Sequence, residues 1–445
     1  MRILVRGWIP VVALASISST FASACAAQST PVAQDCRVGF YRLQDRTGID
    51  IGATSGTSLR WRRRDGTTGE LVPGADGTLT SQLGWTGRPD GHRISFSDCS
   101  TGRISVDGVA GRRVSFETRE TIFESAGVSL AGRLIEPRGA RRYPIVVLVH
   151  GSESVSARAF YALQRQLPAE GIGAFVYDKR GTGASAGTFT HDYHVLATDA
   201  AAAVNEARRL AGARAGRIGF QGSSQGGWVA PLAASLTRVE FVVVGYGLAV
   251  SPFDEDDEAV TLDLTRHGFG GDDIPKALEI ARAAQAIALR NFQSGYEEFD
   301  AVRARYASEP WFRYVRGNLT QVIQSQPREV LREQGPQMFA GILPHYDPMP
   351  VLRTLDTPQL WILGADDIDA PSARTVERLR GLIRAGRPIA TVIYPRAEHG
   401  IYEYETDAAG ERLSTRQPAT YLPLMVDFIR DGKIRARYAD STIYR

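Results

Sequence analysis

Runs of consecutive aliphatic residues recur along the second part of the chain and predict buried strands. Such runs are apolar on both faces, as in strands of a parallel sheet covered by helices on either side. They lie at 145–149, 174–177, 217–220, 241–244, 359–363 and 390–394. Segments with helical spacing lie between most of them, at 156–170, 195–211, 226–237 and 372–385. This alternation predicts an α/β fold with a mostly parallel sheet flanked by helices.

One segment between two of these strands, residues 245–358, is too long for a connecting loop and carries no strand pattern. Its apolar spacing is helical, above all over 274–292 and 297–306. Long insertions at the strand ends of a sheet are usually functional. We therefore predict a helical cap insertion over about 250–345 that shapes a substrate pocket.

The first part of the chain has a different pattern, in which short runs alternate apolar and polar residues. These runs lie at 38–41, 59–61, 94–96, 104–106 and 114–116, and Asp-Gly pairs separate several of them. Such spacing predicts a small antiparallel sheet or sandwich. We assign it to a β-rich accessory domain over 28–117, followed by a second domain over 118–445 that opens with a hairpin. We find no catalytic constellation in the first domain and expect a structural or substrate-positioning role, with carbohydrate or surface binding as the alternative.

Composition and charge exclude several classes of protein. The chain has 445 residues, of which 43% are hydrophobic and 23% charged, so it is globular rather than disordered. Its length favours two folded parts rather than one. The formal net charge of +3 gives no reason to expect a nucleic-acid or membrane-surface partner.

The first residues have the pattern of a secretory signal peptide. Arg2 and Arg6 precede an apolar run over 8–15, and small residues follow over 21–27. The run is too short to span a membrane. We predict a signal peptide over 1–27 and export to the periplasm or the extracellular space. A lipoprotein with its lipid on Cys25 is the alternative.

Two cysteines remain beyond the signal segment, Cys36 and Cys99. Because an exported protein enters an oxidising compartment, we expect a disulfide between them. Two unpaired thiols are the alternative, and neither cysteine has the spacing of a metal ligand.

The segment around Ser224 carries the clearest chemical signal. Gly222, Ser224 and Gly226 form a G-x-S-x-G motif that follows a predicted strand and precedes a predicted helix. That context is typical of a nucleophile elbow, a sharp turn that presents a serine hydroxyl near a helix N-terminus. The sequence therefore predicts Ser224 as a nucleophile.

A serine nucleophile needs a base, and the base needs an acid that orients it. His399 directly follows the last predicted strand, where the base of such a site is expected. The remaining histidines, in other positions, are His92, His150, His191, His194, His267 and His345. For the acid, Asp366, Asp367 and Asp369 all follow the preceding strand and compete.

An acyl-transfer site also needs N–H donors for the oxyanion. We expect one from Gln225, the residue after the nucleophile, and the other from Ser152 or Glu153, at the end of the first buried strand. An inward carboxylate would oppose an oxyanion. We therefore expect Glu153 to turn toward solvent or toward a cation such as Lys179 or Arg180.

Taken in order, these motifs resemble those of the α/β-hydrolase superfamily, and more narrowly its dienelactone-hydrolase and prolyl-oligopeptidase-like branch. They are His150-Gly151, Tyr177–Ser185, Gly222–Gly227, Gly364–Asp367 with Pro371, and His399-Gly400. The resemblance covers about 118–432, and it implies the α/β-hydrolase fold and a catalytic acid at Asp367, with Asp366 as the runner-up. It also implies a structural role for the Tyr177–Ser185 segment.

We predict a serine hydrolase that cleaves carboxylic esters through Ser224, His399 and Asp367 and an acyl-enzyme. The alternatives are a peptidase or aminopeptidase of the prolyl-oligopeptidase-like type, a thioesterase, and a binding protein on a hydrolase scaffold. No metal or organic cofactor is implied. The expected partner is a small-molecule ester or peptide substrate, with no nucleic acid and no integral membrane span. The sequence does not indicate an oligomeric state.

Overall fold

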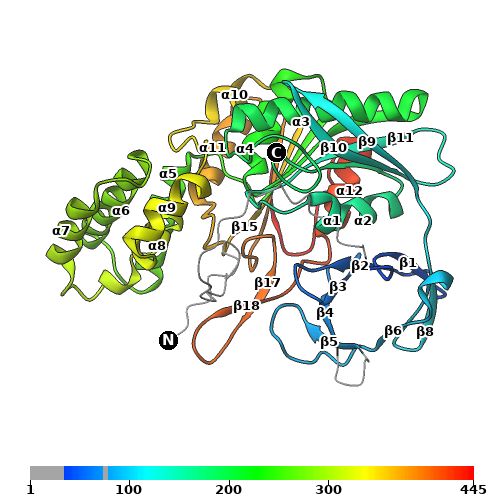
Figure 1. The fold of residues 1–445 in the computed structure, drawn as a ribbon, viewed down its shortest axis with the longest axis horizontal. Helices are drawn as coiled ribbons and strands as arrows, with labels where there is room; N and C mark the ends of the chain where they lie inside the picture. Colours follow the sequence, from blue (N-terminus) through cyan, green and yellow to red (C-terminus); the bar gives the residue numbers. More distant parts are fainter. Residues whose placement is uncertain (1–34, 74–78) are drawn as a thin grey trace, which may run out of the picture.

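The computed structural model describes residues 35–73 and 79–445, and these residues form two large sheets (Figure 1). The predicted signal peptide and Cys25 lie outside the described residues. One sheet is antiparallel and lies in the N-terminal part, and the other is mostly parallel. The chain passes from one to the other through residues 114–116.

The larger sheet contains every strand predicted from the aliphatic runs. Its order is β19 (Thr442–Tyr444), β16 (Ile389–Tyr394), β15 (Gln359–Gly364), β14 (Phe241–Gly245), β13 (Ala215–Ser223), β11 (Tyr143–Val149), β12 (Gly173–Tyr177), β10 (Val128–Glu136) and β9 (Glu117–Ser125). The strands from β16 to β12 pair in parallel, and the outer strands pair antiparallel. Because parallel strands end at one edge, the loops after β11, β13, β15 and β16 gather there.

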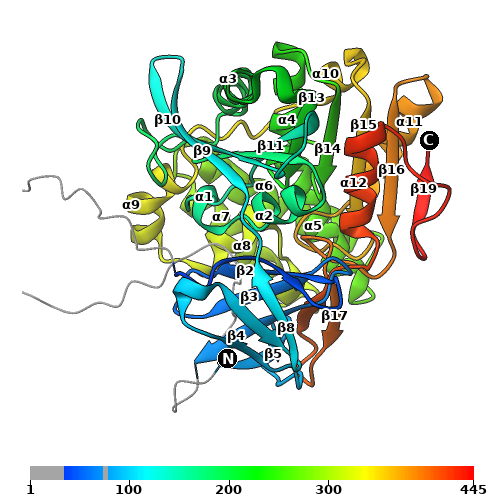
Figure 2. The ribbon, with the colours of Figure 1, turned by 90° about the vertical axis from the view of Figure 1, so that its right-hand side faces the viewer.

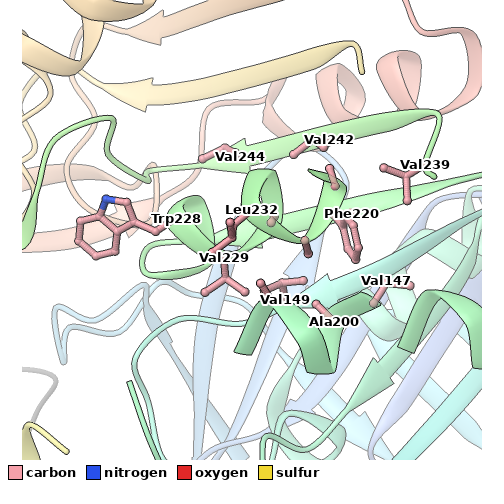
Figure 3. Packing of buried hydrophobic residues seen from close by; sticks show 14 of the residues in the cluster. Val147, Val149, Ala200, Phe220, Trp228, Val229, Leu232, Val239, Val242 and Val244 are labelled. Atoms are coloured by element: carbon pink, nitrogen blue, oxygen red, sulfur yellow. The ribbon is translucent and has the colours of Figure 1, made fainter. Parts of the chain in front are cut away.

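Alternate residues of the central strands enter two different hydrophobic cores. Val147 and Val149 pack against one pair of helices, while Val146 and Leu148 pack against helices on the other face. The first pair is α3 (Tyr193–Ala211) and α4 (Gly226–Leu236), and the second is α2 (Leu163–Ala169) and α12 (Tyr421–Asp431). Figure 3 shows Val147 and Val149 against Ala200 of α3 and Val229 of α4. Each such buried side chain contributes about 1.5–3 kcal/mol, which explains the continuous aliphatic runs.

The segment between β14 and β15 is helical, and in Figure 1 much of it stands to one side of the larger sheet. It holds α5 (Pro252–Arg266), α6 (Asp273–Leu289), α7 (Tyr296–Tyr306), α8 (Asn318–Ser325) and α9 (Arg328–Met338). These helices have a core of their own that includes Phe253, Ile280 and Trp311. The helix expected over 274–292 ends at Leu289, because Asn291 and Phe292 take left-handed φ values of 50° and 60°.

The N-terminal sheet is larger than its sequence pattern predicted. Its order is β5 (Leu79–Leu83), β4 (Thr68–Pro73), β3 (Leu59–Arg63), β2 (Gly48–Ala53), β1 (Gly39–Leu43), β8 (Val109–Arg113), β7 (Arg103–Val106) and β6 (Ile94–Phe96). The strand predicted at 114–116 was wrong. Val114 donates one hydrogen bond to the Phe40 carbonyl (2.7 Å), and these residues then leave the sheet. The predicted disulfide between Cys36 and Cys99 is confirmed.

A hairpin that the sequence pattern did not predict joins the two parts. It consists of β17 (Glu403–Thr406) and β18 (Arg412–Arg416) and lies beside the N-terminal sheet in Figure 2. The backbone N–H of Trp85 donates to the Ser414 carbonyl at 2.8 Å, and Arg88 pairs with Glu405 at 2.6 Å. The indole of Trp85 also meets the ring of Tyr402 at 4.5 Å. Trp85 therefore connects the N-terminal sheet region with the hairpin and the residue before it.

Two buried residues of the N-terminal sheet, Trp61 and Asp50, have different partners. Trp61 is 2% exposed and belongs to the core of the N-terminal sheet. Asp50, fully buried in β2, accepts hydrogen bonds from Arg165 of α2 at 2.5 and 3.1 Å.

Over the described ranges, no helix has the length and apolarity that crossing a bilayer requires.

Candidate active site

Ser224 occupies the turn between β13 and α4, and its backbone is held in a left-handed conformation with φ of 52°. A non-glycine residue with this φ is uncommon, and such strain is typical of functional turns. The flanking glycines are required by close packing. A Cβ at Gly222 would collide with the Gly226 carbonyl oxygen, and one at Gly226 with the carbonyl oxygen of Val149. The motif therefore forms the sharp turn that the sequence predicted.

His399 lies in the loop after β16 and faces Ser224. Its Nε2 is 3.1 Å from the Ser224 Oγ, and its Nδ1 is 2.9 Å from the Asp367 Oδ2. The ring of Tyr246 meets the imidazole edge-on, with centroids 4.9 Å apart. The three side chains named from the sequence thus form one hydrogen-bonded series, although they are far apart along the chain.

The two neighbouring aspartates after β15 have different partners. Asp367 is 2% exposed, and its Oδ1 accepts hydrogen bonds from the backbone N–H groups of Asp369 (3.1 Å) and Ala370 (2.8 Å). Asp366 instead accepts a hydrogen bond from the Tyr404 hydroxyl of the hairpin at 2.8 Å. Asp367 is therefore the carboxylate that contacts His399.

The imidazole of His399 lies in an acidic environment. Burial alone would lower its pKa, but the carboxylates of Asp367, Asp369 and Glu255 outweigh burial and raise the pKa to about 9. Glu255 comes from α5 of the inserted segment. Its Oε1 accepts a hydrogen bond at 3.0 Å from Asn318, which also donates to the Asp369 carbonyl at 2.6 Å. Burial raises the pKa of Glu255 to about 8, and neighbouring carboxylates act in the same direction.

We expect the Glu255→Gln variant to shift the acid limb of the kcat/KM profile to lower pH by about half a unit to one unit. A base must be neutral to accept a proton, so activity rises as His399 deprotonates. Near pH 9 the Glu255 carboxylate is ionised and stabilises the imidazolium. Its removal therefore lowers the pKa of His399. The measurement is hydrolysis rate against pH.

Glu258→Gln is the matched control for this experiment. Glu258 lies on the same helix, but its carboxylate is 3.4 Å from Arg374, and it is not among the main causes of the raised pKa of His399. Its profile should match that of the unsubstituted protein. If the acid limb of the kcat/KM profile shifted to higher pH in Glu255→Gln, or shifted equally in both variants, the result would contradict the assigned interaction between Glu255 and His399.

The loop after β11 brings backbone groups beside the nucleophile. A Cβ at Gly151 would lie 3.4 Å from the Ser224 Cβ, so this residue adjoins the serine. The Gly151 N–H donates to the Tyr161 hydroxyl at 3.2 Å. Within the part of the chain that the structure describes, the N–H groups of Ser152 and Gln225 have no hydrogen-bond acceptor. Both therefore remain available as oxyanion donors.

The charged residues around this loop depart in part from the sequence-based expectation. The side chain of Glu153 is 35% exposed, and its carboxylate lies 3.7 Å from the His150 Nδ1. Lys179 interacts electrostatically with Glu153, as expected. The expected alternative partner, Arg180, instead makes two hydrogen bonds to Asp199, at 2.8 and 2.6 Å. It ties the loop after β12 to α3.

His191 is a residue near the site that sequence reasoning did not select. The Gln225 Nε2 donates to its Nδ1 at 2.7 Å, and its Nε2 donates to the Met338 carbonyl at 3.1 Å. Burial lowers the pKa of His191 to about 4, so the ring is neutral and can accept from Gln225. The inserted segment is thus connected through His191 to Gln225, the residue after Ser224. The only feature of the sequence that pointed to His191 was its position after a predicted crossover.

Comparison with protein families agrees with this architecture. A family model described as "Alpha/beta hydrolase family" matches residues 146–412, a range that includes Ser224, Asp367 and His399. The chain belongs to the alpha/beta hydrolase family. The match spans the inserted helices and ends inside the β17–β18 hairpin, and it does not include the N-terminal sheet.

Several solved structures resemble this alpha/beta hydrolase at low identity. An esterase of Pyrococcus furiosus is 17% identical over 64% of this chain and 83% of that chain, with a TM-score of 0.41. The acylaminoacyl peptidase of Pyrococcus horikoshii is 14% identical over 79% of this chain and 52% of that chain, with a TM-score of 0.40. Est1E of Butyrivibrio proteoclasticus, with ferulic acid bound, is 17% identical over 70% and 97%, with a TM-score of 0.38. No curated protein sequence matches significantly. The function of this alpha/beta hydrolase is therefore argued from its own residues.

Proposed function

We propose that this alpha/beta hydrolase is an exported serine hydrolase that cleaves carboxylic esters. The observation that carries the proposal is the hydrogen-bonded series from Ser224 through His399 to the buried carboxylate of Asp367. A serine in a left-handed turn at a helix N-terminus, paired with a histidine that a carboxylate orients, is the arrangement that nucleophilic acyl transfer needs.

The proposed reaction has two acyl-transfer steps. Ser224 attacks the ester carbonyl while His399 accepts its proton, and Asp367 stabilises the imidazolium. The N–H groups of Ser152 and Gln225 stabilise the oxyanion. His399 then gives its proton to the leaving alcohol, and an acyl-enzyme forms. Water, deprotonated by His399, attacks the acyl-enzyme. As the bond between the acyl carbon and the Ser224 Oγ breaks, His399 returns the proton to that oxygen, and the carboxylic acid leaves.

The disulfide between Cys36 and Cys99 supports the export part of the proposal, because such bonds form and persist in oxidising compartments. We further propose that residues 28–117 form an accessory domain and residues 118–445 the catalytic domain. The inserted helices would act as a cap over the substrate, since Glu255 and Asn318 reach the loop that carries Asp367.

Turnover of two probes by the mature protein tests the proposal. We expect hydrolysis of a short-chain p-nitrophenyl ester, slow or no hydrolysis of an aminoacyl p-nitroanilide, and covalent labelling of Ser224 by a fluorophosphonate. An ester is favoured because its alkoxide leaves more readily than an amine. Comparable turnover of the anilide would support a peptidase instead. Failure of both substrates and of labelling would reject a serine hydrolase.

A further inference from the structure

Lys179 is a buried cation to which the proposed reaction assigns no role. It follows β12 at the second position, and its side chain is 3% exposed. Its Nζ donates a hydrogen bond of 2.7 Å to the Gly151 carbonyl oxygen. An ammonium group removed from water costs several kcal/mol unless its interactions are good. A neutral side chain could fill this position with a smaller desolvation penalty, so the presence of a charged group needs an explanation.

The Gly151 carbonyl belongs to the same peptide group as the Ser152 N–H. A trans peptide is planar, and its C=O and N–H point in opposite directions. By holding the carbonyl, Lys179 therefore fixes the direction of the Ser152 N–H on the far side of the peptide. The preceding N–H, that of Gly151, is held by the Tyr161 hydroxyl at 3.2 Å. The loop beside Ser224 is thus anchored at two successive groups.

We propose that Lys179 is a positioning residue that holds the Gly151–Ser152 peptide with the Ser152 N–H directed at the oxyanion on Ser224. The inference rests on the proposed acyl-transfer function and adds the group that orients one oxyanion donor. Lys179 itself does not contact substrate. A charged donor at the carbonyl also polarises the peptide, which makes its N–H a stronger donor toward negative charge.

The groups around Lys179 fit this role. Glu153, on the loop after β11, is its counter-charge, and the Phe189 ring lies 5.0 Å from the ammonium. The imidazoles of His150 and His191 face it from the end of β11 and from the segment before α3, and burial lowers the pKa of both. Burial lowers the pKa of Lys179 itself to about 8, against the raising effect of Glu153. The ammonium is therefore charged at neutral pH.

The test compares Lys179→Met with the unsubstituted protein and with Lys433→Met, an exposed lysine after α12. We expect Lys179→Met to lower kcat for a p-nitrophenyl ester about 10- to 100-fold, with KM within about threefold. The affinity for phenylboronic acid, which forms a tetrahedral adduct on Ser224, should fall in parallel with kcat. Lys179→Arg, which keeps a charged donor, should recover part of the loss, and Lys433→Met should change neither quantity.

A loss that appears only in KM, or only in the folded fraction measured by circular dichroism, would overturn the positioning role. So would an unchanged kcat in Lys179→Met when the unsubstituted protein is active, which would leave the proposed function intact. An inactive unsubstituted protein would overturn both proposals.

If Lys179→Met does not fold, Glu153→Gln replaces it. Loss of the counter-charge lowers the pKa of Lys179, so the ratio of kcat at pH 9 to kcat at pH 7 should fall below that of the unsubstituted protein. The main charges that raise the pKa of His399 are Asp367, Asp369 and Glu255, and Glu153 is not among them. The pH response of His399 should therefore be nearly the same in both proteins, and the change in the ratio reports on Lys179. An unchanged ratio would overturn the proposal.

Discussion

The Ser224→Ala variant is expected to lose at least about 10⁴-fold in kcat for the p-nitrophenyl ester while keeping its fold. The hydroxyl forms the bond to the acyl group, and no neighbouring group replaces it at 3.1 Å from the His399 Nε2. Alanine retains the Cβ and tolerates the turn as serine does. The measurement is initial rate at saturating ester, beside a thermal melt that confirms the folded state.

Ser223→Ala is the matched control for the nucleophile. Its hydroxyl accepts a hydrogen bond from Gln221 at 2.9 Å and also interacts with the Tyr246 hydroxyl, whereas His399 pairs with Ser224. We expect this variant to keep at least about a tenth of the activity. Inactivation by Ser223→Ala together with an active Ser224→Ala would transfer the nucleophile to the neighbouring residue.

The second large effect is expected from Asp367→Asn, with a loss of about 10²- to 10⁴-fold in kcat. The carboxylate accepts from the His399 Nδ1 and thereby leaves Nε2 free to take the serine proton. An amide can offer an N–H to the ring and favour the other tautomer. The measurement is kcat for the same ester, with binding of phenylboronic acid as a second readout.

Asp366→Asn distinguishes the acid from its neighbour. Asp366 holds the Tyr404 hydroxyl of the hairpin, so we expect its loss to cost less than about tenfold in kcat. Equal losses in the two variants, or a larger loss in Asp366→Asn, would contradict the assignment of Asp367.

The parallel strands of the larger sheet, β11 to β16, could be predicted because most of their residues are buried on both faces and each strand contains a run of aliphatic residues. The N-terminal strands were found less completely. In β2, for example, the buried residues include Asp50, and its partner Arg165 lies in a helix of the other part, α2. A local sequence pattern cannot predict the burial of this carboxylate, because the burial depends on a guanidinium that is distant in the sequence.

Some residues of the candidate site could likewise be predicted from local sequence, and others could not. Ser224 and His399 carry local signals, a glycine motif and a position after a strand. The acid was selected by resemblance, because Asp366 and Asp367 differ only in which distant partner each one meets. Lys179 and His191 act through backbone carbonyls of remote segments, Gly151 and Met338. Such contacts depend on the assembled fold and leave no periodic trace in the sequence.

The hairpin β17–β18 has a consequence for how this gene can be recombined. It leaves the loop that carries His399, touches Asp366 through Tyr404, and rests on Trp85 and Arg88 of the N-terminal sheet. A chimera that exchanges the N-terminal sheet at residue 117 would replace those contact residues while keeping the hairpin that they contact. The sheet and the hairpin therefore need to be exchanged together, although almost 300 residues of sequence lie between them.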